Sequence, residues 1–471
     1  MVEPSYHALL QENQQLRQQL ATALGQIADL QAQVTQLAGA LEEARRAGKR
    51  QAAPFRKGPP KAQPKTPGRK VGDAHGRHGH RPPPAAGQID EVLEARLPDV
   101  CPCCGGPLLE TTIAQQYQTE IPREPLRRQF NIHVGHCQQC GQRVQGRHPL
   151  QTSDAVGAAA SQVGPDAQAA IAALNKQAGL SHGKVVNCLE TLFGIDLSRG
   201  ASAQIVLRAS ERLEPVYEEI RHATRDADQL VADETGWRVG GRPAWLHVWV
   251  SEQATCYAVD RRRSADALED LLGLDWDGWL IHDGYSTYDR FTAALHQQCL
   301  AHILRRAREM LEDAVGGAVH FPRQVIHLFT GAIHLHNEYR AGRATAAVLE
   351  CARDDYEEQL LRLLNVERAV PAYATLSAHL ERHFESWFTF LTNPEMPATN
   401  WAAEQAIRPA VVNRKVWGGN RTVAGAAAQG ILTSVLETCK KQTVSALDFI
   451  SSSLRAFGNA LLPRPVLLGT R

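Results

Sequence analysis

The chain has 471 residues, which is too long for one ordinary domain, and its 43% apolar content can support a sizeable folded core. The formal net charge of +1 hides an uneven distribution, since residues 45–81 carry 12 Lys and Arg against one acid, whereas residues 231–290 carry 6 Arg against 11 acids. The sequence shows no membrane span, no secretory signal and no disulfide framework, because five of the ten cysteines form two tight clusters and the others are scattered, as in a reducing cytoplasm with one metal site.

The N-terminal residues 6–41 follow a heptad pattern over about five repeats. One core position holds Leu9, Leu16, Ala23, Leu30 and Leu37, and the other holds Tyr6, Asn13, Leu20, Ile27, Val34 and Leu41. Leu at one position with Ile or Val at the other favours a parallel two-stranded coil, in which Asn13 would fix the register. We therefore predict a coiled-coil (leucine zipper) dimerisation segment over residues 1–44. The alternative is a single amphipathic helix that packs on the body of the protein.

Residues 45–88 consist mainly of Pro, Gly, Lys, Arg and His. Such a segment cannot bury apolar area, so we predict a basic linker that is disordered when free. Its positive charge favours contact with a DNA backbone, independent of base sequence. A solvated linker without a partner is the alternative.

Two C-x-x-C pairs, each followed by glycine, lie within residues 89–150. Their thiolates predict one tetrahedral structural Zn²⁺ in a zinc-binding module that organises DNA binding and takes no part in catalysis. The predicted ligands are Cys101, Cys104, Cys137 and Cys140, with Cys103 as a thiol that could replace a neighbour and His133 and His136 as less favoured ligands. The gap of 32 residues between the pairs requires a hairpin or small sheet, for which residues 111–134 alternate sufficiently. Free thiols or redox chemistry are the alternatives.

Residues 151–226 form a predicted helical segment with three helices between residues 165 and 224. Pro165 opens the first, Gly179 and Ser181 precede the second, and Gly194 and Ser198 precede the third. Helices of this size suit a helix-turn-helix DNA reader with Ser198–Arg208 as its recognition element. A small helical bundle without DNA contact has the same pattern.

Residues 227–304 predict the first part of an α/β core. Residues 229–239, 245–250 and 255–259 read as strands, residues 264–272 as a short helix, and residues 278–283 as a further strand. Three antiparallel strands, a helix and another strand follow the order of a ribonuclease H-like core, a mixed sheet flanked by helices. Asp233 and Asp283 stand at or near strand ends, where acids from neighbouring strands can converge on one metal site.

A third acid, Glu404, lies in a predicted helix at residues 400–409, on the same face as Arg408, and Arg414 and Lys415 follow. Cleavage of a phosphodiester needs an activated nucleophile and a stabilised leaving oxygen, which two Mg²⁺ ions about 3.5–4 Å apart provide. Magnesium, or Mn²⁺ in its place, binds a few carboxylates together with waters and substrate oxygens. Each acid alone reads as a turn residue or a surface ion pair, so the joint pattern carries the prediction.

Residues 305–395 are helical by pattern and too long for a simple loop between the second and third acids. They predict a helical insertion that closes over DNA. Residues 396–471 then form the second part of the core, with the third acid and C-terminal helices. Within it, the Gly- and Ala-rich residues 418–430 predict a close-packed turn and helix that support the helix of Glu404.

The same residues resemble the transposases of the insertion sequence 66 group. The matching segments are Ala232-Asp-Glu-Thr-Gly-Trp-Arg-Val, His282-Asp-Gly-Tyr-Ser-Thr-Tyr, Cys299-Leu-Ala-His302-Ile-Leu-Arg-Arg, and Asn400-Trp-Ala-Ala-Glu404-Gln-Ala-Ile-Arg-Pro with Asn413-Arg-Lys-Val-Trp. The resemblance implies a DDE triad of Asp233, Asp283 and Glu404, in a ribonuclease H-like fold interrupted by a helical insertion. Gln405 stands where that family usually has Arg.

The sequence therefore predicts a DDE transposase, a bacterial cytoplasmic and nucleoid-associated enzyme that cleaves and joins DNA at the ends of an insertion sequence. Its predicted partners are DNA, a second copy of itself and accessory proteins of the same element, with no membrane. Arg408, Arg414, Lys415 and His302 are the predicted DNA-binding residues. Two alternatives remain open: a zinc-dependent DNA-binding regulator on an inactive scaffold, and another ribonuclease H-like nuclease such as a junction resolvase.

Overall fold

The computed structural model describes residues 14–37 (apart from 28, 32 and 35), 84–92, 103–107, 115, 124–151, 162–366, 370–457 and 462–469. The chain divides into two compact units, residues 1–120 and 121–471. Residues 45–83 of the predicted linker and the predicted zinc ligand Cys101 lie outside the described residues.

In the first unit, the described residues between 14 and 37 are helical, as the heptad pattern predicts. The large apolar side chains of both heptad positions are 51–70% exposed: Leu16, Leu20, Ile27, Leu30, Val34 and Leu37. The prediction of a helix is thus confirmed for these residues, while the pairing of two such helices stays a prediction. One 3-10 turn, η2 (Ala86–Gln88), follows in this unit.

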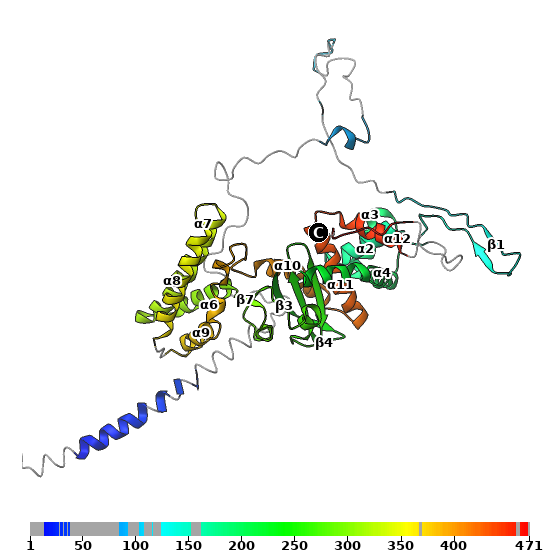
Figure 1. Cartoon of the computed structure of the whole chain (residues 1–471). Coiled ribbons are helices and arrows are strands. Elements are labelled where there is room, and N and C mark those ends of the chain that lie inside the picture. The colour runs from blue at the N-terminus through cyan, green and yellow to red at the C-terminus, as the bar shows by residue number, and fades with distance from the viewer. Residues whose placement is uncertain are drawn as a thin grey trace, which may run out of the picture. The chain divides into compact units, whose positions relative to one another are not determined.

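A five-stranded mixed sheet forms the centre of the second unit (Figure 1). Its order is β5-β4-β3-β6-β7, in which β3 pairs antiparallel with β4, β4 antiparallel with β5, and β6 parallel with both β3 and β7. The strands are β3 (Gln229–Val239), β4 (Arg242–Val250), β5 (Thr255–Asp260), β6 (Trp279–His282) and β7 (Leu295–Gln298). This mixed sheet is consistent with a ribonuclease H-like core, and the strands predicted at 229–239, 245–250, 255–259 and 278–283 are confirmed.

Alternating side chains give β3 two buried faces. Leu230 and Ala232 belong to one hydrophobic cluster, whereas Val231, Trp237 and Val239 belong to another on the opposite face. The sheet is therefore covered by helices on both sides, as the apolar strands require.

The face of Leu230 and Ala232 is covered by helices that precede the strands in the sequence, by one helix between strands, and by helices near the C-terminus. They are α2 (Pro165–Lys176), α3 (His182–Phe193), α4 (Arg199–Arg225), α5 (Asp266–Leu272), α11 (Val423–Lys441) and α12 (Ala446–Ala456). Helix α11 covers the outer strand β5, where Ser434 and Thr438 hydroxyls accept hydrogen bonds from the amides of Tyr257 and Thr255. An edge strand is thus protected from pairing with another chain.

The predicted helical insertion lies over the second face and shares its core. It contains α6 (Leu300–Asp313), α7 (His320–Arg340), α8 (Ala346–Leu364) and α9 (Pro371–Arg382), with α7 beside α8 in Figure 1. Short 3-10 turns are η3 (Tyr288–Arg290), η4 (Gly316–Val319), η5 (Phe384–Ser386) and η6 (Thr389–Leu391). Helix α10 (Trp401–Trp417) follows, and the turn after it is fixed to β3 because Asn420 donates its amide hydrogen to the carbonyl of Arg238 at 2.9 Å.

Among the helices of the described residues, none combines the length and apolar character that a membrane crossing requires.

Candidate active site

Asp233 and Asp283 lie side by side at the sheet. Strands β3 and β6 are parallel, and their register ends with Val231 opposite Ile281. Asp233 lies two residues beyond Val231 in β3, and Asp283 directly follows the last residue of β6. Hydrogen-bonded strands are about 4.8 Å apart. Because side chains alternate along β3, Asp233 lies on the face of Val231, which is the face that the helical insertion and α10 cover. The charge of Asp283 acts on Asp233 there.

Asp283 is fixed by the tight turn that follows β6. Its Oδ1 accepts a hydrogen bond from the amide of Tyr285 at 3.0 Å. Gly284 has φ +82°, and a Cβ atom at this position would stand 2.7 Å from Oε1 of Gln298. Only glycine fits there without displacement, so the turn holds the Asp283 backbone close to β7.

Helix α10 brings Glu404 to the same face of the sheet. Ala403 and Ile407, on either side of Glu404 in α10, are buried in the core of that face. The Tyr257 hydroxyl of β5 donates to the carbonyl of Ala406 at 2.8 Å, and further along the helix Arg414 contacts the Thr235 hydroxyl of β3 at 3.4 Å. Helix α10 therefore lies across the strands with its first turn, which carries Glu404, on the side of the two aspartates.

Electrostatics show that the three acids are close enough to act on one another. The pKa of Asp233 is raised from 3.8 to about 8, first by burial and then by the negative charges of Asp283, Glu234 and Glu404. Among the described residues, the ion pairs include neither Asp233 nor Asp283. The site thus concentrates negative charge that no basic side chain of the described residues neutralises at the two aspartates.

Unlike the two aspartates, Glu404 lies beside basic side chains. Its Oε1 lies 3.6 Å from Nε2 of His302 and 3.8 Å from Arg305, both on α6. In the part of the chain that the structure describes, no three His, Cys, Asp or Glu side chains are gathered tightly enough to hold a metal ion. The three acids are therefore neighbours whose carboxylates stand apart, with Glu404 turned toward α6.

Glu234, which the sequence prediction did not select, is the fourth acid of the site. Its side chain is only 2% exposed, and it pairs with Arg263 at 2.7 Å and accepts a hydrogen bond from the Tyr288 hydroxyl at 2.7 Å. The Arg263 guanidinium lies 3.8 Å from the ring centre of Tyr285 and 4.6 Å from that of Trp245. Glu234 is thus a satisfied buried carboxylate on the sheet face opposite Asp233.

A ring contact followed by hydrogen bonds connects this network to the Asp283 turn. The Tyr288 ring lies 4.5 Å from that of His282, which precedes Asp283. Nδ1 of His282 accepts from the amide of Gly284, so its Nε2 carries the proton and donates to Nδ1 of His296, whose Nε2 donates to the carbonyl of Phe291. Burial keeps the pKa of His282 well below its ordinary value, in agreement with a neutral ring. The network therefore fixes the ends of β3 and β6 relative to each other.

We expect Glu234→Gln to lower stability and activity without abolishing activity. Gln keeps the shape of Glu but loses the ion pair with Arg263, and an unsatisfied buried group costs about 1–3 kcal/mol. Urea denaturation and metal-dependent DNA cleavage measure the two effects. Glu350→Gln, an exposed position in α8, is the matched control. An activity loss as complete as that of an Asp233 variant would instead make Glu234 a metal ligand.

The other predicted DNA-binding residues occupy different environments on α10 and α6. Arg408 and Lys415 are exposed, Arg414 is half-buried, and burial together with the charge of Arg238 lowers the pKa of Arg414. His302 is half-buried beside Glu404. Cys299 accepts a hydrogen bond from the amide of Asn400 at 3.3 Å through its sulfur, so it serves as a buried link between α6 and α10.

The second cysteine pair lies at the tip of a two-stranded hairpin. Strands β1 (Val134–His136) and β2 (Arg143–Gln145) are antiparallel and enclose Cys137 and Cys140. The amide of Cys137 donates to the carbonyl of Gln142 at 2.8 Å and that of Gly141 to the carbonyl of Cys137 at 2.9 Å. Backbone amides of Cys140 and Gln139 lower the pKa of the Cys137 thiol, which favours the thiolate that a zinc ion needs.

The predicted hairpin between the two cysteine pairs falls largely on residues outside the described ones. The hairpin in the structure instead encloses the second pair itself. Cys104 of the first pair and the neighbouring Cys103 are among the described residues of the first unit, and both are exposed.

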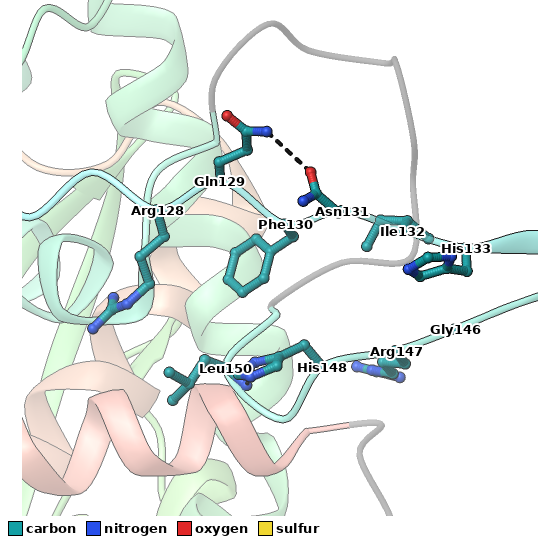
Figure 2. Close-up of a pocket in the computed structure, with 10 residues that line it drawn as sticks. All are labelled: Arg128, Gln129, Phe130, Asn131, Ile132, His133, Gly146, Arg147, His148 and Leu150. Atoms are coloured by element: carbon teal, nitrogen blue, oxygen red, sulfur yellow. Dashed lines mark hydrogen bonds between the residues drawn. The ribbon is translucent and has the colours of Figure 1, made fainter.

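The base of this hairpin encloses a cavity of about 530 Å³ between residues 128–133 and residues 146–150 (Figure 2). Arg128 and Arg147 belong to its lining, and the rings of Phe130 and His148 lie 5.5 Å apart. Its mixture of basic and aromatic groups matches the module's predicted role in DNA binding.

The predicted recognition element Ser198–Arg208 forms the first part of α4. The Ser198 hydroxyl accepts from the amide of Ala201 and caps the helix, as the sequence predicts. One face is buried in the core (Ser202, Ile205 and Val206), while Arg199, Gln204 and Arg208 are exposed. The helix positions are confirmed, whereas contact of this exposed face with DNA stays a prediction.

The chain is similar to a family of transposases and to two proteins of one bacterium. The model of a family described as "Transposase IS66 family" matches residues 160–428. The uncharacterized protein y4qI of Sinorhizobium fredii is 25% identical over 303 residues, which are 55% of this chain and 53% of that protein. The uncharacterized protein y4jO of the same organism is 24% identical over 116 residues, 25% of this chain and 36% of that protein. The matches thus span about half and about a third of these relatives.

Proposed function

The chain belongs to the IS66 family of transposases, and we propose that it cleaves DNA at the ends of a bacterial insertion sequence and joins the freed ends to target DNA. Asp233, Asp283 and Glu404 are the proposed catalytic acids. The observation that carries this proposal is the mutual closeness of the three acids: Asp233 and Asp283 follow the paired residues of β3 and β6, and the charges of Asp283 and Glu404 both act on Asp233.

The three carboxylates are the type of ligand that a pair of Mg²⁺ or Mn²⁺ ions uses. Burial, together with the negative charges of the neighbouring carboxylates, raises the pKa of Asp233. A divalent cation bound between the carboxylates would offset their repulsion. Asp233 and Asp283 would hold both ions and Glu404 would complete the shell of one after leaving His302 and Arg305. Bound Mg²⁺ supplies a more acidic nucleophile and neutralises charge on the leaving oxygen.

The two proposed reaction steps use the same site. Water attacks a phosphodiester at the end of the element, a new P–O bond forms, and the departing oxygen becomes a 3′-hydroxyl. This hydroxyl then attacks a phosphodiester of target DNA, so that one bond forms, one breaks and the strand is joined. Exposed Arg408 and Lys415 on α10, with Arg305 on α6, supply the positive charge that holds the DNA backbone, and His302 lies beside Arg305 at Glu404.

Joining two ends requires two copies of the chain in one complex. The exposed heptad side chains between Leu16 and Leu37 support a parallel coiled-coil dimer, because burying them between two helices removes apolar surface from water. The basic linker, the zinc module and the exposed face of α4 are the proposed elements that recognise the ends, and accessory proteins of the element are further proposed partners in the same complex.

We expect the purified protein to contain one zinc ion per chain, bound by Cys101, Cys104, Cys137 and Cys140. The low pKa of Cys137 supports this assignment. Replacing both Cys137 and Cys140 by Ser should remove the zinc and weaken binding of the element ends, because a structural zinc site stabilises its module directly. Metal analysis and DNA-binding titration measure these effects, with Cys351→Ser, an exposed single cysteine, as control. Full zinc content in the double variant would contradict the ligand set.

The proposed function is tested by incubating the full chain with DNA that carries both ends of its element and with a target plasmid. Nicked and joined products that need Mg²⁺ and disappear with EDTA support a transposase. Binding of the ends without cleavage at any pH would support the DNA-binding regulator instead. Cleavage of branched DNA without joined products would support the junction resolvase.

A further inference from the structure

One tryptophan differs from the others in its exposure. All eight tryptophans lie within the described residues, and seven are buried or half-buried, whereas Trp401 is 64% exposed. An indole ring is the largest apolar side chain, and its exposure leaves a face available for stacking.

Trp401 stands beside the proposed catalytic acids. It is the first residue of α10 and precedes Glu404 by three residues, so the two side chains lie on the same side of the helix. The start of α10 is fixed to the start of α6, because the amide of Asn400 donates to the Cys299 sulfur at 3.3 Å and that of Leu300 to the carbonyl of Ala398 at 3.1 Å. The position of the ring relative to Glu404 and α6 is thus set by the fold.

The two helices that meet at Trp401, α10 and α6, carry cationic and polar side chains. Arg305 of α6 is 57% exposed and contacts Glu404, as does His302. Arg408 is exposed two turns further along α10 on the side of Trp401. The side chain of Asn400 is completely buried, and its amide has no hydrogen-bond partner among the described residues. An exposed aromatic ring among basic groups is the arrangement that binds a nucleic-acid strand with unstacked bases.

We propose that Trp401 stacks on an unpaired nucleobase next to the phosphate that the enzyme cleaves, an inference that rests on the proposed function of the site. The basic side chains of α6 and α10 hold the phosphates on either side, and the indole covers the face of the base between them. In a duplex that face is covered by the neighbouring base pairs, so the ring selects DNA whose end is frayed or single-stranded. Trp401 thereby keeps the cleaved end open and in place for the joining step.

The test uses the full chain and a DNA duplex with a short single-stranded 3′ overhang that contains 2-aminopurine, in Ca²⁺ so that no strand is cut. Stacking on Trp401 should quench the fluorescence of the wild-type complex. Trp401→Ala should remove the quenching and weaken binding of the overhang DNA about 5- to 100-fold, while binding of the blunt duplex changes less than about twofold. Trp401→Phe should keep part of both effects.

The control is Val412→Ala, a 53% exposed position on the same helix, which should leave affinity and quenching unchanged. Equal affinity and equal quenching for Trp401→Ala and wild type would overturn the proposal. A change in the oligomeric mass of the DNA-free Trp401→Ala protein would also overturn it, since a second copy of the chain would then cover the ring. The assay measures no cleavage, so its failure is distinct from failure of the proposed transposase activity.

Discussion

Asp283→Asn and Asp233→Asn should each reduce strand cleavage and strand transfer at least about a thousandfold, below detection in a standard assay. Asn retains the shape of Asp but loses the charge that holds a divalent ion, and the register of β3 and β6 leaves no other acid in the position of either aspartate. Binding of the element ends should change little, since it depends on the basic groups. Gel assays of nicked and joined products measure the first effect, and titration of labelled DNA measures the second.

Asp289→Asn is the matched control, because Asp289 is exposed six residues beyond Asp283 and should leave product formation unchanged. Asp283→Cys gives a positive test of metal contact: a thiolate prefers Mn²⁺ to Mg²⁺ more strongly than a carboxylate does, so activity should return in part with Mn²⁺. Wild-type amounts of joined product from Asp283→Asn would rule out the assignment of the site.

Removing the charge of Asp233 should stabilise the metal-free protein at high pH. The folded state keeps a proton on Asp233 between pH 3.8 and about 8, whereas the unfolded state has released it. The free energy of unfolding therefore falls as pH rises through this window. Asp233→Asn stays neutral and lacks this loss, so above pH 8 in EDTA it should unfold at a higher temperature than wild type. Differential scanning fluorimetry over a series of pH values measures the difference.

Added Mg²⁺ should make the unfolding temperature of the wild type higher than that of Asp233→Asn. The ion binds ionised carboxylates of the folded state and stabilises the wild type increasingly as its concentration rises, whereas Asp233→Asn gains little stability from the ion. The difference between the two proteins should thus change sign as Mg²⁺ is added above pH 8. If the unfolding temperatures of the two proteins in EDTA differ by the same amount at every pH, the prediction fails, because Asp233 then titrates in the folded state as it does in the unfolded chain.

Much of the core could be predicted from the sequence because its signals are local. The strands alternate or run continuously apolar, Ser181 and Ser198 cap helices as their positions suggest, and Gly194 ends α3 in a left-handed conformation. Asp283 is recognisable because it ends an apolar run directly before a glycine, and in the structure it follows β6, the parallel neighbour of the strand that carries Asp233.

The residues that the sequence did not reveal depend on partners far away in the chain. Glu234 reads as a neighbour of Asp233, and its role depends on Arg263 and Tyr288, which stand 29 and 54 residues away. Asn400 and Trp401 read as ordinary residues at a helix start. Asn400 is buried and Trp401 is exposed only because of the way α10 packs against α6 and the sheet. The hairpin around Cys137 is a further feature without a sequence signal, because two three-residue strands carry almost no periodicity.

Anomalous X-ray scattering from Mn²⁺ in crystals of the protein bound to DNA of an element end tests the central claim most directly. We expect manganese between the carboxylates of Asp233 and Asp283, with Glu404 turned away from His302 and Arg305 to complete the coordination. Manganese bound elsewhere, or a Glu404 that remains paired with α6 while both aspartates carry no ion in a complex competent for cleavage, would contradict it.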